Sequence, residues 1–176
     1  MKKTLFIIFL TAVISTGMFV ENAFADHPDG LGISIKGSWG STWVYRTTQS
    51  GPSLSIKTKA SPVFWGIRLD INEDKPGLFL SGDYYLNHNP LVQDINLYWY
   101  YGVGAEFGIG MGENNFSLGA GVRVPVGISF QIEFTSFPTL EFFMQLVPRM
   151  GIQFVPFHFP YGLWGFDLGA RIWLDV

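Results

Sequence analysis

The chain has 176 residues and a net charge of −3, so it offers no strongly basic surface for a nucleic-acid partner. It has no cysteine, which excludes a disulfide-stapled secreted scaffold and a lipid-anchored cysteine. Charged residues make up only 14% of the chain, against about 25% in an ordinary soluble domain, while aromatic residues make up 17%. This balance favours a protein that contacts lipid.

The start of the chain has the form of an export signal. Lys2 and Lys3 precede a mostly apolar stretch, and a small-x-small pattern, typical of a cleavage site, ends at Ala25. We therefore predict a signal peptide over 1–25, cleaved after Ala25, and one domain over 26–176. The alternative, a single transmembrane anchor, requires a longer uninterrupted apolar run.

Clusters of Gly, Pro, Asn, Asp and Ser divide the remaining chain into eight segments. These breaks are predicted at 47–52, 60–62, 72–77, 87–94, 110–115, 133–139 and 155–162. The segments alternate apolar and polar residues, and none is apolar enough to span a membrane as a helix. A hydrophobic exported chain of this kind can pair its backbone groups in lipid by closing its strands into a ring. We predict an all-β fold, an eight-stranded antiparallel up-and-down transmembrane β-barrel.

The longest alternation covers residues 116–132, where every even-numbered side chain is apolar and the odd-numbered ones are small, polar or proline. Strands of soluble proteins usually have about five or six residues, whereas tilted membrane strands are longer. Pro125 and Pro148 lie within predicted strands, and we predict a β-bulge at each because proline cannot donate to the ladder. The residues predicted to face lipid include Val122, Val124, Ile128, Leu146, Leu168 and Ile172.

Charged side chains fall on the opposite, inward parity. The predicted interior network comprises Arg68, Asp70, Asp83, Glu106, Arg123, Glu141, Asp167 and Arg171. A charge inside a narrow barrel is costly unless it is paired, so we expect ion pairs that plug the interior. The alternative is that these charges line a narrow ion path.

Motifs for catalysis or cofactor binding are weak. The glycines of 102–110 superficially resemble a phosphate-binding loop, but no helix-forming run or P-loop lysine follows them. Ser81, Asp83 and His88 form the one local grouping suited to a hydrolase, and alternation places His88 on the opposite face from the other two. We predict no enzymatic activity, no cofactor and no metal site.

Three segments resemble a known family: Gly-Val-Arg-Val-Pro-Val-Gly-Ile-Ser-Phe at 121–130, Leu-Glu-Phe-Phe-Met-Gln-Leu-Val-Pro at 140–148, and Gly-Ala-Arg-Ile-Trp-Leu at 169–174. They are similar to the small eight-stranded outer-membrane barrels of spirochaetes. Those barrels are described as similar to the transmembrane domains of outer-membrane proteins A and X. The resemblance covers about 63–176.

This resemblance implies a plugged barrel in the bacterial outer membrane, surrounded by outer-membrane lipids, with a structural or adhesin-like role toward host or surface proteins. We expect a monomer. One alternative is a narrow channel or a conduit for hydrophobic compounds. A second is a soluble exported lipocalin-like binding barrel, which would turn its apolar wall inward around a ligand.

Overall fold

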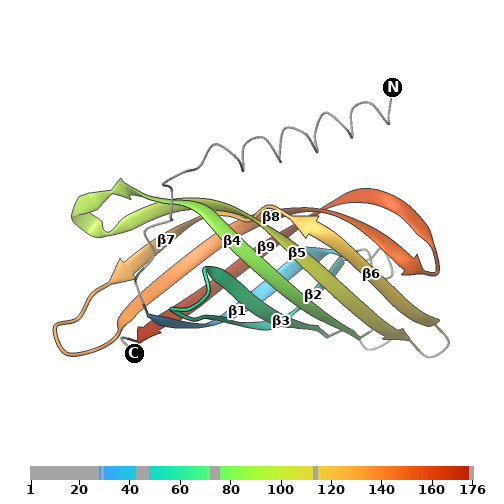
Figure 1. The fold of residues 1–176 in the computed structure, drawn as a ribbon, viewed down its shortest axis with the longest axis horizontal. Helices are drawn as coiled ribbons and strands as arrows, with labels where there is room; N and C mark the ends of the chain where they lie inside the picture. The colour runs from blue at the N-terminus through green and yellow to red at the C-terminus, as the bar shows by residue number, and fades with distance from the viewer. Residues whose placement is uncertain (1–27, 29, 43–47, 72–75, 113–114, 175–176) are drawn as a thin grey trace, which may run out of the picture.

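The structure of the protein, a computed structural model, describes residues 28, 30–42, 48–71, 76–112 and 115–174 (Figure 1). The predicted signal peptide, 1–25, lies outside these residues. Among the residues that are described, no helix is long and apolar enough to cross a membrane.

The described chain forms an antiparallel nine-stranded sheet. Its strands are β1 (Leu31–Ser41), β2 (Thr48–Lys57), β3 (Val63–Asp70), β4 (Gly77–Val92), β5 (Leu97–Gly112), β6 (Asn115–Arg123), β7 (Val126–Ile132), β8 (Thr139–Val155) and β9 (His158–Leu174). A short 3-10 turn, η1 (Gln93–Ile95), joins β4 to β5. The predicted all-β, antiparallel character is confirmed.

Strand pairing continues around the whole sheet. β1 pairs with β2 and β9, β3 with β2 and β4, and β4 also with β5. β5 and β8 each pair with both β6 and β7, and β8 also pairs with β9. Every described strand therefore has neighbours on both sides, and the long strands cross the molecule obliquely (Figure 1).

The ninth strand arises from an interruption at Val124 and Pro125. Arg123 pairs with Gly104 and Val126 pairs with Tyr101, so two residues separate these pairs on both β5 and its partner. β6 and β7 therefore have the same register against β5. The carbonyl of Pro125 still accepts a hydrogen bond of 2.9 Å from the Gly102 N–H. β6 and β7 thus lie end to end along the same two neighbours.

Neither predicted proline bulge is present. Pro125 causes an interruption without a register shift, and its buried side chain keeps the inward parity. Pro148 pairs in register with Trp164, and its carbonyl accepts a hydrogen bond of 2.9 Å from the Val124 N–H. The bulge predictions were wrong because the remaining carbonyl groups are enough to keep the ladder aligned at both sites.

Four predicted turns, at 47–52, 87–94, 110–115 and 155–162, are largely strand; the first two illustrate this. β2 already includes Thr48 to Pro52, and β4 continues to Val92 through a segment rich in Asn. The ladder between β4 and β5 explains the second case, because Asn89 and Pro90 pair with Trp99 and Tyr98. The chain reverses at η1, where Asn96 has a positive φ of 50°.

The two faces of the sheet have the opposite polarity to that of a soluble protein, with apolar side chains outside and polar ones inside. Apolar side chains on the outward parity are exposed: Ile35 is 62% exposed, Trp65 57% and Leu146 58%. The buried set includes the aromatic residues Phe64, Tyr85, Tyr100, Phe143 and Trp173 and more polar than apolar side chains. A soluble protein places its large apolar side chains inside, so this surface needs an apolar surrounding.

Candidate functional site

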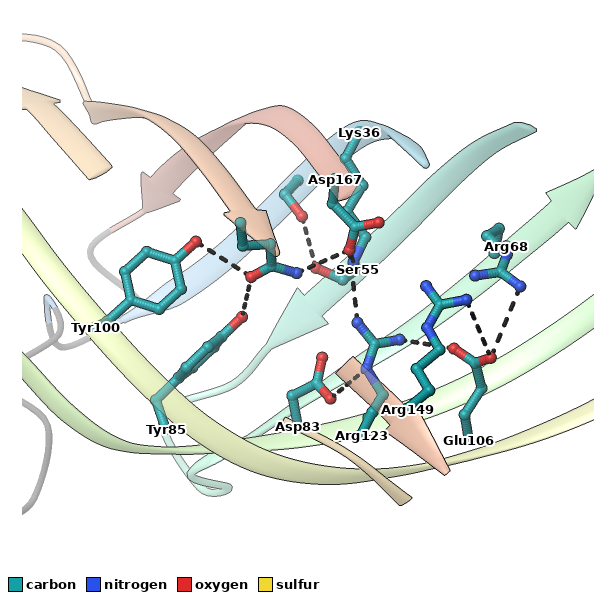
Figure 2. Close-up of polar contacts among 12 residues, drawn as sticks. Lys36, Ser55, Arg68, Asp83, Tyr85, Tyr100, Glu106, Arg123, Arg149 and Asp167 are labelled. Atoms are coloured by element: carbon teal, nitrogen blue, oxygen red, sulfur yellow. Dashed lines mark hydrogen bonds and ion pairs between the residues drawn. The ribbon is translucent and has the colours of Figure 1, made fainter. Parts of the chain in front are cut away.

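Arg123 is the centre of a buried ion-pair network. It lies at the end of β6, and its guanidinium group contacts carboxylates from three other strands (Figure 2). Its Nε lies 3.0 Å from Oδ1 of Asp83, its Nη1 2.8 Å from Oε2 of Glu106, and its Nη2 3.5 Å from Oδ2 of Asp167. The five-donor fork of arginine suits this role, since one side chain reaches β4, β5 and β9.

Asp167 extends the network to Lys36 and, through the neutral side chain of Gln145, to two tyrosines. Its Oδ2 accepts from Lys36 Nζ at 3.0 Å and from Gln145 Nε2 at 2.8 Å. The amide oxygen of Gln145 in turn accepts from the hydroxyl groups of Tyr85 and Tyr100, at 3.2 and 3.1 Å. Hydrogen bonds therefore connect β1, β4, β5, β8 and β9 across the interior (Figure 2).

Glu106 is shared between several arginines. In addition to its contact with Arg123, Glu106 has its Oε1 3.7 Å from Nη2 of Arg68 and 3.9 Å from Nη1 of Arg149. Arg68 also places its Nε 2.8 Å from Oδ1 of Asp70. The Arg68 guanidinium packs over the Phe79 ring, with 4.2 Å between its Cζ and the ring centroid, so the cation is held by charge and by an aromatic face.

A second cluster is centred on Glu141 in β8. Its Oε2 accepts from Arg171 Nη1 and from the Trp173 indole N–H, both at 2.8 Å. The Arg171 guanidinium lies over the Phe64 and Phe143 rings, with 4.5 and 4.8 Å from its Cζ to the two centroids. Glu141 has no exposed surface, so these two donors offset the desolvation of its carboxylate.

The buried charges balance in the described chain. The buried cations are Lys36, Arg68, Arg123, Arg149 and Arg171, and the buried carboxylates are Asp70, Asp83, Glu106, Glu141 and Asp167. The exposed fraction of these residues does not exceed 7%. Unpaired charges at such depth would be strongly destabilising, whereas equal numbers in contact offset much of the desolvation cost.

All eight residues of the predicted interior network are buried, and each takes part in an ion pair. Within this set, Arg123 contacts Asp167, and Arg171 contacts Glu141. Lys36 and Arg149 belong to the network but were not in the predicted set. Gln145 was missed as a bridge because its partners come from three other strands.

The residues predicted to face lipid lie on the outward side of the sheet. The exposed fraction is 54% for Val122, 38% for Ile128, 58% for Leu146 and 48% for Leu168. Val124 and Ile172 are half-buried between outward neighbours.

The predicted facing of His88 was wrong. An irregularity between Tyr85 and Asn87 shifts the β4 register against β5, which turns His88 inward. His88 is 2% exposed, its Nε2 lies 3.2 Å from the Ser129 hydroxyl, and its ring stacks on Tyr98 with 4.6 Å between the ring centroids. The sequence contains no signal for this shift, because it depends on how two strands pair.

Small residues make room for the network, and Gly104 allows a direct test. A methyl group at Gly104 would overlap Oδ1 of Asp83 and the carbonyl oxygen of Gly82. We expect Gly104→Ala to displace Asp83 from Arg123 and to lower the free energy of unfolding by about 1–3 kcal/mol. Urea unfolding in detergent micelles measures this change. Gly162→Ala is the matched control, since a methyl group there meets no atom within 4 Å; equal stability of the two variants would contradict the prediction.

The described residues hold no group of three His, Asp or Glu side chains arranged to bind a metal ion. No protein-family model and no curated protein matches the chain. Among solved structures, the crystal structure of Neisserial surface protein A (NspA) is similar, with a TM-score of 0.50 and 14% sequence identity. The match covers 82% of this chain and 97% of that chain. The likeness supports a β-barrel-like fold for this protein.

Proposed function

We propose that the protein is an integral outer-membrane β-barrel of eight tilted strands, in which β6 and β7 act as one strand. Its role is structural or in surface interaction, without catalysis. The observation that carries this proposal is the inverted polarity of the sheet, with paired charges inside and large apolar side chains outside. Its surroundings would be outer-membrane lipids, and the three segments similar to spirochaete barrels support the same assignment.

The strand registers support a closed eight-stranded ring. A path across paired residues runs from Ile33 on β1 to Gly162 on β9. On β9, Gly165 lies three residues after Gly162 and pairs with Gly40 of β1. Gly40 is seven residues beyond Ile33, and the offset on β9 adds three more. A full circuit of the ring therefore ends about ten residues beyond its start on β1. Such a stagger accompanies a strand tilt of about 35–45°. At that tilt, the 10 residues of β2 span the ~25 Å apolar band of an outer-membrane barrel.

The likeness to a surface protein and the predicted export signal favour the outer membrane. The first and last described strands begin and end at the same rim, because Leu31 pairs with Leu174. With that rim in the periplasm, the connections β1–β2, β3–β4, β5–β6 and β8–β9 face the outside. Contacts with host or surface proteins would use these four connections.

Insertion of the refolded mature chain into lipid vesicles tests the proposal. We expect the protein to float with the vesicles and to resist proteases over its strands, while protease added to intact cells cleaves only at those four connections. A mature chain that stays soluble and monodisperse without detergent would instead support the lipocalin-like alternative.

The interior charges determine whether the barrel conducts ions. Because Arg123 contacts three carboxylates in mid-barrel and the buried charges balance, we expect a closed interior. Planar bilayers that contain the purified protein should therefore show no discrete conductance steps. Reproducible steps would favour the narrow channel or conduit over a plugged barrel.

A further inference from the structure

The outward face carries a broad apolar groove over β1 to β6. Its volume is about 910 Å³, within the range of about 300–1,000 Å³ typical of small-molecule sites. Its apolar walls include Leu54, Trp65, Ile67, Leu80 and Phe107. No residue of β8 or β9 lines this groove.

Small residues form the floor of this groove. Gly82 pairs with Ala105 across β4 and β5, and Ala120 pairs with Phe107 across β5 and β6. At these positions the sheet lacks the bulky outward side chains found elsewhere. Trp65, which pairs with Gly82, lies against it so closely that a methyl group at Gly82 would come 3.1 Å from the indole ring. The indole therefore lies over Gly82, at the edge of the floor that Ala105 and Ala120 form.

The lining of the groove suits a hydrocarbon ligand. Glu106 is the one charged residue that lines it, and its carboxylate is directed inward, where Oε2 lies 2.8 Å from Arg123. The groove thus offers no charged group to a ligand. It lies within the apolar band that the strands present to lipid, since paired residues on both sides of it, such as Ile67 and Leu80, are exposed and apolar.

We propose that this groove is a binding site for a single lipid acyl chain, which rests on the small-residue floor against Trp65. A chain in the groove contacts protein on its floor and both sides, whereas a chain on a convex part of the outward surface contacts protein on one side only. Dispersion contacts accumulate with each such neighbour, so the bound chain exchanges more slowly than surrounding lipid. The inference rests on the proposed membrane-spanning fold and adds a specific lipid site to it.

Photolabelling tests the site. The mature protein is reconstituted into vesicles of phosphatidylethanolamine and phosphatidylglycerol that contain a trace of phosphatidylcholine with a diazirine-bearing acyl chain. After irradiation, adducts are mapped by mass spectrometry. We expect several-fold more adducts at Leu54, Trp65 and Leu80 than at Leu146 and Leu168 on the opposite wall.

Two substitutions fill the floor from the exposed side. Ala105→Leu and, independently, Ala120→Leu should reduce adduct formation in the groove to the level of the opposite wall. The matched control is Ala170→Leu, an outward alanine on β9 that pairs with Ile35 and Phe142, and it should leave the excess unchanged.

The outcomes separate the two proposals. Equal labelling of both walls, or an excess that survives both filling substitutions, would overturn the acyl-chain site while leaving the barrel in the membrane. Labelling of β8 and β9 with none in the groove would mean that another occupant, such as a second copy of the chain, covers it, and would also overturn the site. Absence of labelling on both walls would overturn the membrane-spanning proposal itself.

Discussion

Replacing Arg123 with alanine should lower the free energy of unfolding by about 3–5 kcal/mol, the usual cost of removing one partner from a buried ion pair. The substitution leaves Asp83, Glu106 and Asp167 facing one another without the guanidinium group that contacts all three. Like charges in a desolvated interior repel strongly, so these carboxylates add to the cost. Urea unfolding of the refolded protein, followed by tryptophan fluorescence, measures the change.

Arg123→Lys is the informative companion to this variant. It keeps the positive charge but has a single ammonium group in place of the fork, so we expect a loss of stability smaller than that of the alanine variant. Lys59→Ala serves as the surface control, because Lys59 is exposed and should contribute within about 0.5 kcal/mol. If Arg123→Ala were as stable as this control, the ion pairs would not stabilise the interior.

Removing Glu141 should have an effect of comparable size. Glu141→Ala leaves the Arg171 guanidinium and the Trp173 indole N–H buried without their shared acceptor. We expect a loss of about 3–5 kcal/mol in the same urea experiment, since Arg171 keeps its charge at every accessible pH.

A double substitution distinguishes pairing from packing. Glu141→Gln combined with Arg171→Met removes both charges while retaining much of the side-chain volume. The double variant should be more stable than Arg171→Met alone, because that single variant leaves Glu141 charged and buried. A double-mutant cycle of Glu141→Gln, Arg171→Met and their combination gives the coupling free energy, expected at about 0.5–3 kcal/mol. A coupling of zero would mean that their 2.8 Å contact does not stabilise the fold.

Alternation in the sequence was enough to predict which side chains face inward over most of the sheet. Arg68, Arg123 and Glu141 lie where period-two alternation puts them, because a strand has one geometry for side-chain direction. Opposite charges on the same inward parity then predict pairing without any knowledge of distances. The physical reason is that burial leaves a charge few alternatives to a partner.

The parts that could not be predicted depend on contacts between strands. His88 faces inward because β4 shifts its register against β5, and nothing in the local sequence marks that shift. Pro125 and Pro148 looked like bulge sites, but cross-strand carbonyl groups keep the register there. Gln145 bridges Asp167 to two tyrosines only because of where β4, β5 and β9 place them.

The unequal lengths of the strands have a consequence for the bilayer itself. β3 has 8 residues, whereas β5 has 16 and β8 has 17, and the longer strands carry exposed apolar side chains close to their ends, such as Met111 and Phe154. A bilayer of uniform thickness cannot match both walls, and deforming it costs a fraction of a kcal/mol per Å of mismatch. In the proposed membrane-spanning barrel, lipids should therefore be compressed beside β3 and stretched beside β8, which would impose a thickness gradient across its diameter.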